Sequence, residues 1–169
     1  MLQIYERDEL LGDSLEGFVR GSLVAGESVI VIATEAHRDD LTSRLRRSGV
    51  DVAAALASEQ LIPRDAEEML AEFMLKGWPD DAMFEAAIGR ILNRAQAGKR
   101  RVRAFGEMVA VLWSKGSSGA TVRLEHLWNQ FIHKADFSLF CAYPKSGFTR
   151  DALQSLQEIC TAHTRVIES

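Results

Sequence analysis

The chain of 169 residues is long enough to form one domain around a single hydrophobic core, without disulfides or metal ions to stabilise it. Apolar residues make up 47% and charged residues 26%, close to the average for globular proteins, which disfavours the disordered, collagen-like and coiled-coil classes. The formal net charge of −4 argues against nucleic acid or an anionic membrane surface as a partner.

Five short segments rich in branched and aromatic residues are predicted to form buried strands. In chain order they are Leu2–Tyr5, Ser28–Ala33, Gln60–Pro63, Arg101–Phe105 and Phe137–Tyr143, of which the first and third are the weaker. Between them, apolar residues recur every three to four positions, which predicts amphipathic helices. These helices contain Leu11 to Leu23, Leu41 and Leu45, Met69 to Met74, Phe84 to Leu92, Met108 to Trp113, Val122 to Ile132 and, last, Arg150 to His163.

Alternating strands and helices are typical of a parallel sheet with helices on both faces. We therefore predict an α/β fold, a three-layer sandwich whose mainly parallel central sheet has about five strands. Lys76–Asp80, with Gly77 and Pro79, is predicted to be a loop, and Asp51 and Asp65 are predicted to cap the helices that follow them. No repeat or Pro-rich linker divides the chain, so residues 1–169 are predicted to form a single domain.

The longest apolar run, Val29–Ala33, is far too short for a membrane helix. Polar residues follow Met1 at positions where a secretion signal would be basic and then hydrophobic. We therefore expect a cytoplasmic protein without a membrane partner. Cys141 and Cys160 lie among apolar neighbours without metal-ligand spacing, so they are expected to be buried free thiols. No cofactor is expected.

Sequence signals for catalysis are missing. The phosphate-loop pattern GxxxxGK[ST], the dinucleotide pattern GxGxxG after a strand and the nucleophile pattern GxSxG do not occur. Without them neither nucleotide hydrolysis nor serine-type acyl transfer has its usual residues, and the chain is predicted not to be an enzyme.

Ligands of open parallel sheets usually bind beyond the carboxyl ends of the strands. Polar and aromatic residues follow the predicted strands there and form the candidate ligand site: Tyr5, Thr34, Glu35, His37, Glu107 and Tyr143. Glu107 lies in a segment whose other residues are expected to be buried, so its carboxylate either faces a ligand or pairs with an arginine. Glu107 and Tyr143 are expected to line the pocket, with the other four residues at its edge.

Simpler roles remain open for several of these residues. Thr34 and Glu35 are also what a helix start requires, a cap and a carboxylate near the positive end of the helix dipole. His37 fits a surface histidine as well as a group that titrates near neutral pH. Tyr143 fits half-buried packing as well as a pocket wall. Arg101 and Arg103 are either solvated, paired with a buried carboxylate, or exposed to an acidic partner.

Several short blocks of sequence resemble the MEDS family, the methanogen and methylotroph sensory domain of DcmR type. The FGEM block within Arg103–Val109 and the CAYP block Cys141–Pro144 are the most specific. The others are Gln3, Tyr5 and Glu6, Ala25–Glu27 before Val29–Ile32, Thr34–Glu35 with His37–Arg38, Leu112–Trp113 and Leu127–Asn129. The resemblance covers about residues 2–148, and residues 149–169 are left as a C-terminal helix.

The resemblance implies a RecA-like or KaiC-like core that lacks its nucleotide-binding loop and acts as a sensor of simple hydrocarbon derivatives. It also implies a signalling partner such as a histidine kinase or a transcription regulator. The alternative is a ligand-independent adaptor for protein interaction on the same scaffold. The hypothesis that the chain is an enzyme rests only on the carboxylates of the candidate site and is the weakest of the three. Either kind of module can also form a homo-oligomer.

Overall fold

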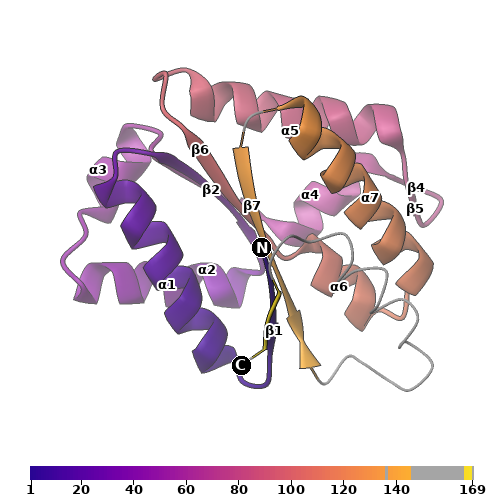
Figure 1. The fold of residues 1–169 in the computed structure, drawn as a ribbon, viewed down its shortest axis with the longest axis horizontal. Coiled ribbons are helices and arrows are strands. Elements are labelled where there is room, and N and C mark those ends of the chain that lie inside the picture. Colours follow the sequence, from indigo (N-terminus) through magenta and orange to yellow (C-terminus); the bar gives the residue numbers. More distant parts are fainter. Residues whose placement is uncertain (136, 146–165, 169) are drawn as a thin grey trace.

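The computed structural model describes residues 1–135, 137–145 and 166–168 (Figure 1). Its centre is a parallel sheet with the strand order β3-β2-β6-β7-β1-β8. The strands are β1 (Leu2–Tyr5), β2 (Ser28–Ala33), β3 (Leu61–Asp65), β6 (Val102–Gly106), β7 (Phe137–Pro144) and the short edge strand β8 (Val166–Glu168). The predicted α/β class with a parallel sheet is confirmed, whereas the relation to RecA and KaiC stays a prediction.

Helices cover both faces of this sheet (Figure 1). One layer consists of α1 (Asp8–Val24), α2 (Glu35–Arg47) and α3 (Val52–Ala57). The other layer consists of α4 (Ala66–Phe73), α5 (Asp81–Gln96), α6 (Met108–Ser114) and α7 (Ser118–Lys134). The three layers of the predicted sandwich are therefore present.

Strand β2 shows why the sheet needs two helical layers. All six of its residues are buried. Val29 and Val31 join the core beneath α1, α2 and α3, while Ile30 and Ile32 join the core beneath α4 to α7. Because successive side chains of a strand point to opposite faces, a strand that is apolar throughout must be covered on both.

The edge strand β3 pairs with β2 on its inner side, where Val31 lies opposite Pro63. Pro63 is exposed, in contrast to the buried Leu61 and Ile62 before it. Proline has no backbone N–H, so within sheets it is confined mainly to edge strands and bulges. The proline is therefore compatible with the place that β3 takes at the edge.

The structure differs from the predicted elements at three places. The predicted loop Lys76–Asp80 is partly wrong, because a small hairpin of β4 (Met74–Leu75) and β5 (Trp78–Pro79) occupies this region. Lys76 and Gly77 both have positive φ, as a two-residue hairpin turn of type I′ requires. Strand β8 was not predicted. The predicted helix Arg150–His163 lies outside the described residues.

Candidate functional site

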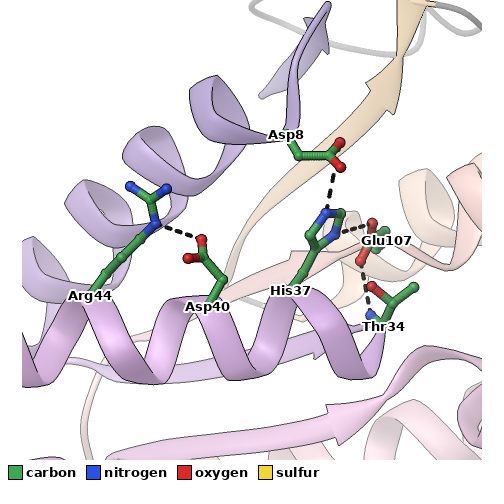
Figure 2. A network of polar contacts seen from close by, with 6 residues as sticks. All are labelled: Asp8, Thr34, His37, Asp40, Arg44 and Glu107. Atoms are coloured by element: carbon green, nitrogen blue, oxygen red, sulfur yellow. Dashed lines mark hydrogen bonds and ion pairs between the residues drawn. The ribbon is translucent and has the colours of Figure 1, made fainter.

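The candidate site begins where β2 and β6 end side by side, with Ile32 paired to Gly106. The N–H of Glu107 donates to the carbonyl of Ile32 at 2.9 Å, which continues the pairing one residue beyond β6. Glu107 then starts α6 as its N-cap residue, but its side chain does not cap that helix. Figure 2 shows that its carboxylate lies instead against the start of α2.

Two groups of the β2–α2 junction hold the Glu107 carboxylate. The backbone N–H of Thr34 donates to Oε2 at 2.9 Å, and Nδ1 of His37 lies 2.6 Å from Oε1. A carboxylate only accepts, so Nδ1 is the donor. The Glu107 side chain is 5% exposed. The buried pair, one of the two alternatives left open for Glu107, is therefore present, but its partners are a histidine and a backbone N–H in place of an arginine.

His37 links three helices through one ring. It is the third residue of α2, its Nδ1 bonds to Glu107 at the start of α6, and its Nε2 lies 4.0 Å from Oδ1 of Asp8 at the start of α1 (Figure 2). The hydrogen bond to Glu107 raises the pKa of His37, burial opposes this, and the charges of Glu107, Asp8 and Asp40 raise the pKa further. With its side chain 19% exposed, His37 is not an isolated surface histidine.

The remaining residues near this group have different roles. Tyr5 is buried in the core beneath α1 to α3. Burial raises the pKa of its phenol, and the negative charges of Glu107 and Asp8 raise it further, so the hydroxyl keeps its proton. Glu35 is exposed at the first position of α2, where a carboxylate is favoured by the helix dipole. Thr34 is the N-cap of α2, but its hydroxyl makes no capping bond.

Tyr143 lies on the other face of the sheet, in the core beneath α4 to α7. Its hydroxyl donates to Oε1 of Glu125 at 2.6 Å, and its ring meets that of Trp113 edge-on at 6.2 Å. The structure therefore brings together Thr34, His37 and Glu107, with Tyr5 close by. It does not place Tyr143 in this group.

Glu125 of α7 is a buried carboxylate that is not among the residues predicted from the sequence. Burial raises the pKa of its carboxyl to about 7, although the hydrogen bond from Tyr143 acts in the opposite direction. A signal was present: Thr121 and Trp128, four residues before and three residues after Glu125, share its face of the helix, and both are buried. A carboxylate on such a stripe is unusual enough to mark a buried polar pair.

A second polar contact joins the ends of β2 and β3. Nη2 of Arg38 lies 2.7 Å from Oδ2 of Asp65, and Nε of Arg38 donates to the carbonyl of Ala33. Asp65 also accepts from the backbone N–H groups of Glu67 and Glu68, and these bonds lower the pKa of Asp65. The predicted cap at Asp65 is thus confirmed.

At the opposite end of β6, Nε of Arg103 forms an ion pair with Oε2 of the buried Glu27 at 2.6 Å. This is one of the alternatives that the sequence left open for the arginines. Cys141 is buried as expected, and burial raises the pKa of its thiol. Cys160 lies outside the described residues.

The described part of the chain contains neither a metal-binding cluster nor a membrane-spanning helix. Within residues 1–135, 137–145 and 166–168, no cluster of three or more histidine, cysteine or acidic side chains is suited to hold a metal ion. None of the helices that the structure describes is long and apolar enough to cross a membrane.

Comparison with known proteins identifies the family. No curated protein matches the chain. The family model of the MEthanogen/methylotroph, DcmR Sensory domain, abbreviated MEDS, matches residues 1–164. The match reaches further toward the C-terminus than the residues 2–148 that carry the sequence resemblance. Because it spans nearly the whole chain, the protein belongs to the MEDS family of sensory domains.

Proposed function

We propose that the chain is a non-catalytic sensory module that binds a small molecule at Thr34, His37 and Glu107, with Tyr5 and Glu35 at the edge of the site. Membership of a sensory family supports the sensing role. The observation that carries the location is the His37 ring, which contacts the starts of α1 and α6 from α2. Simple hydrocarbon derivatives as ligands, and a histidine kinase or transcription regulator as partner, belong to the same proposal.

To relay a signal to a partner, the protein must present a surface that differs between its free and its ligand-bound state. A ligand shifts the equilibrium between two conformations only if it binds them with different affinity. Nδ1 of His37 is held by Glu107, so a ligand would meet Nε2. Contact at Nε2 changes how His37 interacts with Asp8, the first residue of α1. We propose that α1 passes this change to a partner protein.

Thermal melting with a panel of one-carbon compounds, small alcohols, small acids and nucleotides tests the proposal. A ligand that binds the folded state raises the melting temperature by mass action. The shift is expected to disappear in His37→Ala and to persist in His126→Ala, which removes an exposed histidine of α7. A panel without any shift, or an equal shift in both variants, would show that this site does not bind the ligand.

The hairpin of β4 and β5 favours the adaptor as a second candidate function. Leu75 and Trp78 on this hairpin and Met83 on α5 expose large apolar side chains. Leu75 and Trp78 are paired neighbours on the hairpin, and adjoining exposed apolar side chains are typical of protein interaction sites. A partner whose binding ignores every compound of the panel and is lost in Trp78→Ser would favour the adaptor over the sensor.

A further inference from the structure

The gap between the side chains of Asp8 and His37 lies at the solvent-accessible side of the site, since these side chains are 79% and 19% exposed. Oδ1 of Asp8 lies 4.0 Å from Nε2 of His37 (Figure 2). A direct hydrogen bond between such atoms is near 2.9 Å, so this pair is too far apart to form one. Polar atoms more than 3.5 Å apart can be bridged by a third group, such as a water molecule, that forms a hydrogen bond with each. Nδ1 is already bound to Glu107, which leaves Nε2 as the ring atom for a bridging group.

The charges around the ring determine which form of His37 faces the gap. Glu107 at the start of α6, Asp8 on α1 and Asp40 on α2 all face the imidazole, and each favours its protonated form. Protonated Nε2 carries a hydrogen and donates, whereas the carboxylate of Asp8 accepts. A bridging group therefore has to accept from one side of the gap and donate to the other.

The same charges disfavour a charged ligand. The arginines of this region already have carboxylate partners: Arg44 pairs with Asp13 and Asp40, Arg38 pairs with Asp65, and Arg7 lies 4.0 Å from Glu9. Across the described contacts of the gap, the positive charge of His37 therefore faces the negative charges of both Asp8 and Glu107. An anion would be repelled by these carboxylates. An alkylammonium ion has no lone pair with which to accept from Nε2.

Resting on the proposed function, we infer that the ligand is a small uncharged molecule with a hydroxyl group, which bridges His37 and Asp8. The hydroxyl oxygen accepts from Nε2 and donates to Oδ1 of Asp8. Because these two atoms are 4.0 Å apart, one oxygen can lie at a normal hydrogen-bond distance of about 2.8 Å from each. The bridge ties the first turn of α1 to α2. That turn begins at Arg7, whose side chain makes no capping bond, so the bridge adds a contact to an uncapped helix start.

Imidazole resonances of the labelled protein test this inference by NMR at about pH 6, where the unperturbed imidazole is mostly protonated. The probes are the primary alcohols from methanol to butan-1-ol, and the carboxylates and alkylammonium ions of the same chain lengths. An alcohol is expected to shift the His37 resonances in a saturable way, while those of the exposed His126 stay constant. The acids and ammonium ions are expected to leave His37 unchanged.

Two variants test whether the ligand hydroxyl donates its second hydrogen bond to Asp8. Asp8→Ala is expected to weaken alcohol binding about fivefold, the effect of one ordinary hydrogen bond. Glu9→Ala removes an exposed carboxylate one residue away and is expected to change the affinity less than twofold. Tighter binding of a carboxylate or ammonium ion, or unchanged affinity in Asp8→Ala, would overturn the inference.

The outcomes also separate this inference from the proposed function. If a compound without a hydroxyl group raises the melting temperature through His37 and no alcohol does, the sensory site stands and the hydroxyl bridge is wrong. If no compound of either set affects His37 or the melting temperature, both fail.

Discussion

Replacing Glu107 with alanine is expected to lower the free energy of unfolding by about 3 kcal/mol near pH 6. The buried carboxylate accepts hydrogen bonds from the backbone N–H of Thr34 and from Nδ1 of His37. The truncation leaves both donors without their acceptor and removes the negative charge beside the protonated ring. A buried donor without an acceptor loses more than the bond itself contributes, because water does not replace the lost partner.

The size of this loss depends on pH because the contacts with Glu107 raise the pKa of His37 above its usual 6.5 in the folded protein. A base with a raised pKa stabilises the folded state fully below the pKa of the unfolded chain, and this contribution is lost as pH rises through the folded pKa. The difference between the wild type and Glu107→Ala is therefore expected to be largest near pH 6 and smaller near pH 9. It does not vanish at pH 9, because neutral His37 still donates from Nδ1.

Urea unfolding at both pH values measures this difference, with Glu67→Ala as the matched control. Glu67 lies exposed in the first turn of α4, and its loss is expected to cost less than about 1 kcal/mol. An NMR titration of His37 in the wild type provides a second measurement. A loss in Glu107→Ala that is the same at both pH values, or a His37 that titrates below 6.5, would contradict the buried pair.

Replacing Glu125 with glutamine is expected to stabilise the protein above pH 7 and to have little effect near pH 5. Burial raises the pKa of Glu125 from 4.5 to about 7, a difference that corresponds to about 3 kcal/mol. In the unfolded chain the carboxyl ionises near 4.5, so between this pH and about 7 the folded state binds the proton more strongly. Raising the pH across this window therefore favours unfolding of the wild type.

Glutamine keeps the oxygen that accepts from Tyr143 and has no charge to bury. The variant should therefore lack this part of the pH dependence, and its advantage over the wild type should grow from pH 5 to pH 8. Urea unfolding across this range measures it, and Glu9→Gln serves as an exposed control. If the two proteins differ by a constant amount at every pH, Glu125 does not titrate as its burial requires.

Much of the fold was predictable because the strands are short apolar runs between polar segments. The predicted range Ser28–Ala33 agrees with β2, and Phe137–Tyr143 differs from β7 by one residue. The two-residue strands of the hairpin and the three-residue β8 are too short to show a period. Their pairing depends on neighbours that are distant in the sequence or on the turn between them, so composition alone does not reveal it.

The position of the site could be predicted from the sequence, but not all of the residues that contact one another within it. Thr34, His37 and Glu107 were predicted because they follow strand ends, and the neighbouring places of β2 and β6 bring them together. Tyr143 also follows the rule for strand ends, but the alternation along β7 directs it to the opposite face. The strand order, which the sequence does not contain, decides which strand ends are neighbours. Asp8 had no signal of its own, because it lies at an ordinary helix start.

The proline of β3 limits how copies of this domain can assemble. Many proteins extend a sheet across a dimer by pairing two open edges, which requires a continuous row of main-chain donors on each. Pro63 interrupts that row on the β3 side. Continuous cross-subunit sheets through β3 are therefore disfavoured, and a homo-oligomer would form more readily through other surfaces.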